Sequence, residues 1–290
     1  MDEELVIHLF ENPIEHGNFR TKNAPGQKIR PTLVDRGNQL VTKVNLLGIT
    51  HGEMAGGDDL ATLLVFEFRF VPTGGRRFKN AEVTIRFEDS GGKMHLDPVV
   101  HSIAPEGKWA LNKSEKVQNI RLSSNASINA RLGLAGAEAG VKWEFAETRN
   151  CEYYASLSGS KRIARDGSVG EADTVVWTLD ENKHKKDGIP TFMRAAVLLK
   201  RPGNVPFTFT VEVSADVDFA GKIKALIGLE KKDPIDPVEI DPENSTKARH
   251  LQFNALDPDT YDLTEMDKLD LQEVAGVTVV TVLDGGSIAQ

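Results

Sequence analysis

Apolar and polar residues alternate most regularly between Phe207 and Phe219. Every odd-numbered position in this stretch is Phe, Val or Ala, and every even-numbered position is Thr, Glu, Ser or Asp. Successive side chains of a β-strand point to opposite faces of its sheet, so this pattern predicts a strand with one buried face. We expect the strand to lie centrally in the fold, because its large apolar side chains suit a core.

Shorter runs with strand character recur along the chain and are separated by glycine pairs such as Gly56-Gly57 and Gly91-Gly92. Short strands separated by glycine-rich turns are typical of antiparallel sheets. The sequence therefore predicts a mainly β fold: antiparallel sheets in a β-sandwich or barrel-like arrangement, as one domain or as two subdomains. The polar stretch 15–38, rich in Gly, Pro and Arg, is expected to be a loop. The predicted shorter strands are 40–49, 60–71, 81–87, 99–104, 117–122, 151–163, 174–179 and 191–199.

The regular alternation of apolar and polar residues ends at Phe219. We divide the chain into an N-terminal β subdomain (1–115), a second β subdomain (116–229), a linker (230–246) and a C-terminal tail (247–290). The linker contains three Asp-Pro steps, which favour extended backbone because proline lacks an amide donor. In the tail, we expect a short helix from Thr264 and a returning strand from Val274 to Leu283.

Residues 125–147 are rich in small side chains and allow two interpretations. We favour a pair of strands that turns near 136–140 over a short helix, because each glycine disfavours a helix by about 1 kcal/mol relative to alanine. A strand pair of this composition could also insert into a membrane, as in β-pore-forming proteins. The charged residues Arg131, Glu138 and Lys142 count against that alternative, because they interrupt a lipid-facing surface.

The composition narrows the classes of partner and the compartment. The chain has 290 residues, a formal net charge of −8 and a pI near 5.5, which argues against binding to nucleic acid or an anionic membrane. The start of the sequence lacks signal-peptide features, and no apolar run approaches the roughly 20 residues of a membrane-spanning helix. The lone Cys151 allows no internal disulfide. We therefore expect a soluble cytoplasmic protein without a membrane span.

One short motif has the spacing of a metal site. His95 and Asp97 lie two residues apart, and a distant His184 could complete a 2-His-1-carboxylate arrangement for iron. His184 is flanked by lysines, however, and their positive charge opposes a bound cation. We therefore predict that the protein uses no metal and no other cofactor.

No motif indicates a nucleophile. The chain contains no G-x-S-x-G elbow, and Cys151 is better explained as a packed thiol. The favoured function is thus a β-scaffold binding or interaction protein whose partner is a small hydrophobic molecule or another protein. One alternative is a cofactor-independent hydrolase, isomerase or cyclase acting on a small hydrophobic molecule in a cavity between sheets. The other alternative is a β-pore-forming protein.

For a cavity between the sheets, residue type alone suggests which side chains would line it. Aromatic rings provide apolar contact area, and a guanidinium can orient a polar group of the ligand. The predicted ligand-binding residues are Trp143, Tyr153, Tyr154, Trp177 and Arg194.

Overall fold

The computed structural model describes ten parts of the chain. These are residues 23, 25–36, 40–57, 59–72, 75–126, 141–164, 170–218, 236–243, 248–250 and 262–275. Within them, the side chains of residues 36, 112–153 and 248–250 lie outside the description. The strand predicted from Val274 to Leu283 therefore falls almost entirely outside the described residues.

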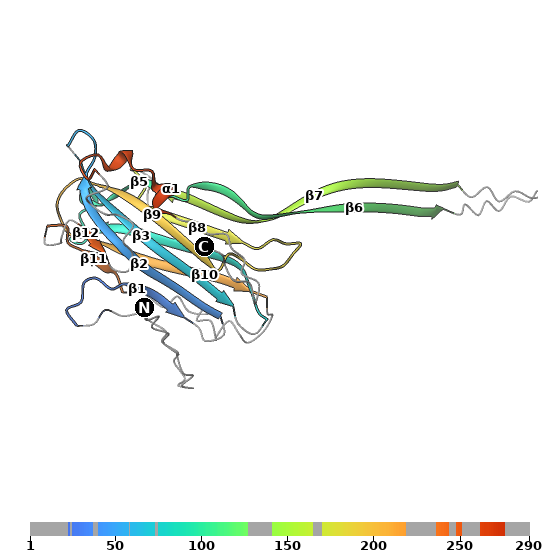
Figure 1. Cartoon of the computed structure of the whole chain (residues 1–290), viewed down its shortest axis with the longest axis horizontal. Coiled ribbons are helices and arrows are strands. Elements are labelled where there is room, and N and C mark those ends of the chain that lie inside the picture. Colours follow the sequence, from blue (N-terminus) through green and yellow to red (C-terminus); the bar gives the residue numbers. More distant parts are fainter. Residues whose placement is uncertain are drawn as a thin grey trace, which may run out of the picture.

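Two antiparallel sheets make up the body of the molecule (Figure 1). Sheet A has the order β1 (Thr32–Arg36), β2 (Leu40–Glu53), β3 (Leu60–Pro72), β9 (Phe192–Arg201) and β5 (Val99–Ala104), with β12 (Ala248–His250) paired to β2. Sheet B has the order β11 (Val238–Ile240), β10 (Phe207–Val217), β4 (Phe78–Asp89), β8 (Thr174–Asp180), β7 (Val141–Arg162) and β6 (Gly107–Ala126). The predicted fold class, a mainly β antiparallel sandwich, is confirmed.

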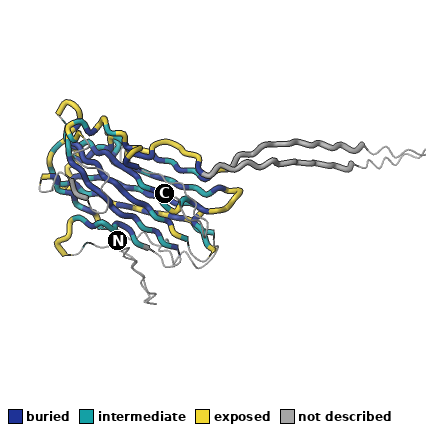
Figure 2. The backbone as a smooth tube through the Cα atoms, viewed as in Figure 1, coloured by how far each residue is buried: buried dark blue, intermediate teal, exposed yellow. Residues whose placement is uncertain are grey.

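The core between the sheets follows from the alternation seen in the sequence. On β10, the odd-numbered positions from Phe207 to Ala215 are buried, whereas the even-numbered ones are half-buried or exposed. Phe209 packs edge-on against Phe66 of β3 at 5.7 Å between ring centroids. Figure 2 shows the same concentration of buried positions along the strands of the body. β10 lies inside sheet B, although β4 and β8 are nearer to its middle.

Each sheet combines strands from distant parts of the chain. In sheet A, β9 pairs along its whole length with β3, from Arg201 opposite Leu60 to Phe192 opposite Arg69. In sheet B, β4 pairs with β10. The boundary that we placed between residues 115 and 116 falls within β6.

Two short strands lie where the sequence suggested loop or linker. β1 occupies part of the stretch 15–38, and its Leu33 and Val34 are buried in the core. β11 lies in the Asp-Pro stretch and pairs with the start of β10. Both strands are set by tertiary pairing, which overrides the weak local preference of so few residues.

The C-terminal residues cover the outer face of sheet A. The 3-10 helix η3 (Met266–Lys268) and the one-turn helix α1 (Leu271–Val274) lie in the region where a helix was predicted. The side chain of Asp270 caps α1 by accepting a hydrogen bond from Gln272 N at 2.9 Å. A second apolar cluster forms beneath these turns; its members are Leu47, Met54, Ala61, Leu63, Val65, Ala104, Ala196, Leu198, Met266, Leu271, Val274 and Ala275.

Candidate functional site

One hairpin extends far beyond the sandwich. β6 and β7 leave the body side by side as a long two-stranded projection (Figure 1). We call the paired stretches Ser114–Ala126 and Val141–Tyr153 the ribbon. Its register runs without interruption from Ser114 opposite Tyr153 to Ala126 opposite Val141. At about 3.4 Å per residue, these thirteen pairs reach about 40 Å.

The root of the ribbon is where contact with the rest of the sheet ends. β7 pairs with β8 only from Ser156 to Arg162. Leu111 and Ala155 are paired and buried here, at 8% and 1% exposure, and they are the outermost pair of the hairpin whose side chains are both described. Among the described residues, no further strand flanks the ribbon, so it continues as two strands alone.

Close packing holds this root in place. The indole Nε1 of Trp177 donates a hydrogen bond to the carbonyl oxygen of Pro105 at 3.0 Å. Gly159 of β7 lies against the same carbonyl, and a Cβ at this position would come within 2.0 Å of it. The root therefore requires glycine at 159, because any larger residue would push Pro105 away from β7.

A β-bulge separates the root from the ribbon. Leu111 pairs with Ala155, but the next pair is Ser114 with Tyr153, so β6 contains one extra residue here. Side chains of a strand alternate between two faces, so one extra residue moves the odd-numbered positions of β6 to the opposite face beyond this point, and the even-numbered positions likewise. As a result, even-numbered positions of β6 share a face with odd-numbered positions of β7 throughout the ribbon.

This exchange collects apolar residue types on one face of the distal ribbon. Ile120 pairs with Glu147, Leu122 with Phe145, Ser124 with Trp143 and Ala126 with Val141. Directly opposed residues of antiparallel strands share a face. We call these eight positions the apolar set. Six of them carry an apolar residue: Ile120, Leu122, Ala126, Val141, Trp143 and Phe145.

The intervening positions form a polar set on the other face. Arg121 pairs with Ala146, Ser123 with Glu144 and Asn125 with Lys142. The register thus places Lys142 in the polar set, which removes one of the three charges that counted against a lipid-facing surface. The other two, Arg131 and Glu138, lie outside the described residues.

The proximal ribbon differs from the distal ribbon. Between Ser114 and Asn119 on β6, and between Thr148 and Tyr153 on β7, polar residue types occupy both faces. Val117 is the one aliphatic residue in these two stretches. The separation into apolar and polar faces therefore begins at Ile120 and Glu147.

The residues that we predicted to line a cavity lie in different layers. Trp177 is fully buried in the core, where its ring lies 5.6 Å from that of Phe68. Arg194 alternates with Met193 and Ala195 of the core cluster, so it lies on the outer face of sheet A opposite Glu67. Burial lowers the pKa of Arg194, and the charge of Glu67 opposes that shift.

The remaining three predicted residues belong to β7. Tyr154 is 48% exposed just beside the ribbon root. Trp143 and Tyr153 are in the ribbon, and their side chains lie outside the description. The structure does not bring the five residues together, and binding of a ligand by any of them stays a prediction.

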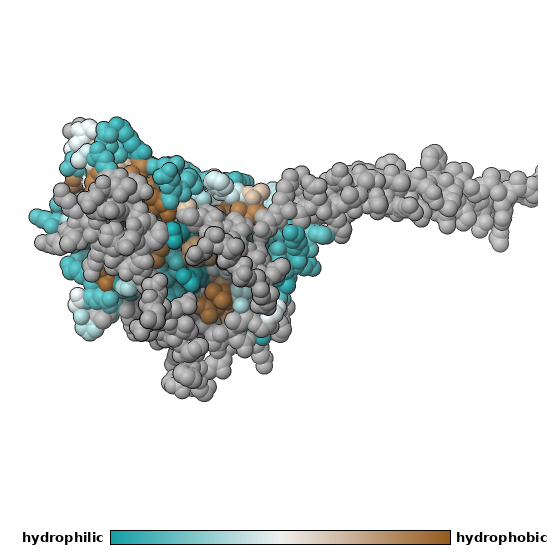
Figure 3. All heavy atoms as spheres, in the orientation of Figure 1, coloured by the Kyte–Doolittle hydropathy of each residue, from teal (hydrophilic) through white to brown (hydrophobic). Residues whose placement is uncertain are grey.

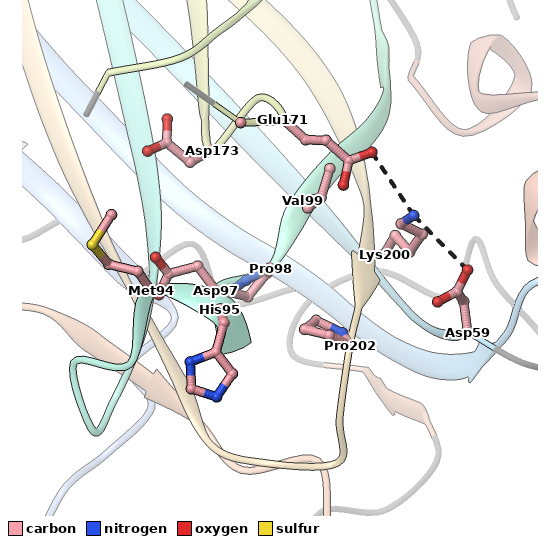
Figure 4. Close-up of a pocket in the computed structure, with 11 residues that line it drawn as sticks. Asp59, Met94, His95, Asp97, Pro98, Val99, Glu171, Asp173, Lys200 and Pro202 are labelled. Carbon is pink, nitrogen blue, oxygen red and sulfur yellow. Dashed lines mark ion pairs between the residues drawn. The ribbon is translucent and has the colours of Figure 1, made fainter. Parts of the chain in front are cut away.

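A hollow of about 260 Å³ contains the His95–Asp97 motif (Figure 4). Figure 4 shows the His95 ring and the Asp97 carboxylate pointing in different directions. Asp97 Oδ1 accepts a hydrogen bond from the backbone N of Asp89 at 2.6 Å, so it fastens β4 to the 3-10 helix η1 (Met94–Leu96). Lys200 lies 3.8 Å from carboxylate oxygens of both Asp59 and Glu171. These acidic groups thus stabilise turns and strand ends of the body.

His184, the third residue of the predicted metal motif, lies in the turn after β8. Its backbone N donates to the side chain of Asn182 at 3.0 Å. Within the described parts of the chain, no group of three or more His, Cys, Asp or Glu side chains could hold a metal ion. The described helices also include none that is long and apolar enough to cross a membrane.

No pattern in the sequence marks His51 as a buried histidine. His51 Nδ1 lies 2.9 Å from Thr62 Oγ1, and the two residues are 7% and 0% exposed. Burial, followed by the charge of Arg201, lowers the pKa of His51 to about 4. The pair at neutral pH is thus an uncharged imidazole and a hydroxyl, both buried in the body.

Few large apolar side chains are exposed among the described residues of the body. In the face seen in Figure 3, hydrophobic residues form small separate areas among hydrophilic ones. Trp109, at 43% exposure, lies at the ribbon root and donates its indole N–H to the carbonyl oxygen of Glu106 at 2.9 Å. The large apolar residues that are exposed in the described parts of the chain are Val71, Met94, Trp109, Tyr154 and Ile163.

Comparison with known proteins gives no family. No family model matches the sequence, and no curated protein matches it. Among solved structures, the membrane-inserted form of the NetB toxin of Clostridium perfringens is similar, with a TM-score of 0.28 and 10% sequence identity. The match covers 61% of this chain and 78% of that one. A TM-score this low supports no inference about function.

Proposed function

We propose that this protein inserts the distal β6–β7 ribbon into a lipid membrane and assembles into a β-pore. The observation that carries the proposal is the register of the distal ribbon, which separates an apolar set from a polar set on two strands that project from the body. Such a dyad pattern suits a strand with lipid on one side and water on the other.

The apolar set supplies a driving force for insertion. Burying a side chain such as Leu122 or Phe145 contributes about 1.5–3 kcal/mol relative to leaving it in water. Tryptophan, as at position 143, is favoured near membrane–water interfaces. Transfer of the six apolar residues of this set into lipid is therefore favourable, provided that Glu147, at the border with the proximal ribbon, and the polar set stay in contact with water.

Assembly follows from the backbone of the ribbon. Two strands alone leave amide and carbonyl groups unpaired along both edges, and each unpaired group in hydrocarbon costs several kcal/mol. Pairing of β6 of one copy with β7 of the next satisfies these groups. The proposal thus requires several copies of the chain in the membrane, not one.

The described part of the distal ribbon supplies most of the length of a membrane strand. A tilted transmembrane strand needs about 9–11 residues to cross the hydrocarbon core. Seven described positions run from Ile120 to Ala126 on β6. The proximal ribbon, polar on both faces, would then bridge between the membrane and the body. The net charge of −8 disfavours anionic lipids, so we expect a preference for zwitterionic membranes.

Release of a trapped dye from vesicles of phosphatidylcholine, sphingomyelin and cholesterol tests the proposal. We expect the full-length protein to release the dye and Phe145→Asp to lose at least tenfold of that activity. The matched variant Ala146→Asp changes the neighbouring position in the polar set and should retain release. An inactive parent protein, or equal release by the two variants, would contradict the proposal.

A second candidate is an interaction protein that binds a protein partner at the ribbon root. Trp109 and Tyr154 favour it, because both are large, exposed and of types that are enriched in protein interfaces. The dye-release experiment separates the two functions, because its vesicles contain no protein partner. Absence of release by the parent protein would favour the interaction protein, whereas release that Trp109→Ala/Tyr154→Ala leaves unchanged would favour the pore.

A further inference from the structure

Charged residue types recur at fixed levels of the distal ribbon. Going outward from the body, the polar set presents Arg121 opposite Ala146, then Glu144 opposite Ser123, then Lys142 opposite Asn125. Each level therefore carries one charge, and the order is basic, acidic, basic. Neither basic residue has a carboxylate residue as its register partner.

We propose that this polar set lines the conducting path of the pore and makes it selective for small inorganic anions. The inference rests on the proposed function, because it requires the ribbon of each copy to contribute to one path. Copies related by rotation repeat every level as a ring, and rings of Arg or Lys favour anions whereas rings of Asp or Glu favour cations.

The balance of the three rings decides the sign of the selectivity. Consecutive levels are two residues apart, which is about 7 Å along a strand and within the Debye length of about 8 Å at 0.15 M salt. The Glu144 level therefore offsets part of the field of its basic neighbours. Two basic levels against one acidic level leave a net positive path.

One more charged level shares the face of the polar set, namely Glu115 opposite Glu152 in the proximal ribbon. It lies six residues, about 20 Å, from the Arg121 level and beyond the Debye length, so it leaves the balance of the three distal rings unchanged.

Residues 127–140 contain Arg131 and Glu138, one charge of each sign, so the sequence there adds no net charge. Glu147 lies in the apolar set opposite Ile120, at the border with the proximal ribbon. The selectivity should consequently depend most on Arg121 and Lys142.

Reversal potentials in a planar phosphatidylcholine bilayer with a KCl gradient test this inference. We expect the reversal potential of the parent channel to lie between zero and the equilibrium potential of chloride. Lys142→Glu should move the reversal potential toward the equilibrium potential of potassium. Glu144→Gln should move it further toward that of chloride. Lys116→Glu makes the same charge change in the proximal ribbon, and it serves as the matched control with reversal near that of the parent.

The outcomes separate the two proposals. Channel currents that favour potassium in the parent, or a reversal potential that Lys142→Glu leaves in place, would overturn the selectivity and leave pore formation intact. An equal shift in Lys116→Glu and Lys142→Glu would also overturn it, because the charge would then act without regard to its level. The absence of any channel current would overturn the proposed function, and the selectivity with it.

Discussion

In the body, β4 and β10 alternate apolar and polar positions, and their apolar positions pack against the opposite sheet. In the distal ribbon, β6 and β7 alternate in the same way, but among the described residues no second sheet lies opposite them. Phe209 of β10 is 1% exposed against Phe66 and Phe87. The apolar set of the ribbon has no such counterpart in the described fold.

This difference in what lies opposite the apolar positions distinguishes the two regions. Alternation in the body is explained within one copy of the chain, because the two sheets bury each other. Alternation in the ribbon has no opposing sheet among the described residues, and the proposed membrane insertion would complete its apolar face. The bulge between Leu111 and Ser114 marks the transition, because it follows directly on the buried pair Leu111 and Ala155.

The largest effect is expected in the body. Val213 of β10 is 6% exposed, and Val213→Asp would place a carboxylate in the core at a cost of roughly 3–5 kcal/mol. Ser214→Asp changes the exposed face of the same strand and should change the free energy of unfolding by less than about 0.5 kcal/mol. Urea unfolding compares the two variants, and similar midpoints would refute the burial of the odd-numbered face.

Acid should weaken the body through His51. Its folded-state pKa of about 4 is below the ordinary value of 6.5, so the unfolded chain binds more protons between these pH values. The free energy of unfolding should therefore fall as the pH drops from 6.5 to 4, by up to about 3 kcal/mol from this residue. His51→Gln should remove that part of the pH dependence. An unchanged dependence would mean that His51 is accessible to protons in the folded state.

The outer face of sheet A offers a smaller test. At Gly52, an added Cβ would lie 2.2 Å from the carbonyl oxygen of Leu263 and 2.5 Å from the sulfur of Met266. Gly52→Ala should displace the C-terminal turns and cost about 1–3 kcal/mol. Gly203→Ala, whose nearest contacts are at 4.0 Å, is the control and should be neutral or slightly stabilising. Equal thermal midpoints would show that the C-terminal turns are not tightly held.

The smallest effect on stability is expected in the ribbon. Leu122→Asp changes the apolar set, but in water it should alter the free energy of unfolding of the body by less than about 0.5 kcal/mol. Its circular dichroism and urea midpoint should match those of the parent. A destabilisation as large as that of Val213→Asp would show that the ribbon packs on the body in solution, and the contrast between the regions would disappear.

Much of the body was predictable from the sequence. The alternation from Phe207 to Phe219 gave the strand, its parity and its buried face, because a period of two is directly visible in residue types. β1 was not predictable in the same way, since only Leu33 and Val34 distinguish it from a loop. Its strand conformation depends on pairing with the neighbouring strand β2, which the residue types of 32–36 do not reveal.

The ribbon was only partly predictable. The small-residue stretch indicated a strand pair, but the proximal ribbon, with residues such as Lys116 and Gln118, has no apolar face to mark it as strand. Alternation within β7 already separates Lys142 from Val141, Trp143 and Phe145. The extra residue between Leu111 and Ser114 decides which β6 positions share each face, and only the register shows that Ile120 and Leu122 lie with Trp143 and Phe145.

The depth of single labels in a membrane tests the central claim most directly. In a Cys151→Ser background, Leu122→Cys and Ser123→Cys place one environment-sensitive fluorophore in the apolar set or in the adjacent polar set. With vesicles that carry a nitroxide on the lipid acyl chains, we predict strong quenching and a blue shift at position 122 and neither at position 123. Equal emission and equal quenching at the two positions would contradict insertion of the distal ribbon with one face toward lipid.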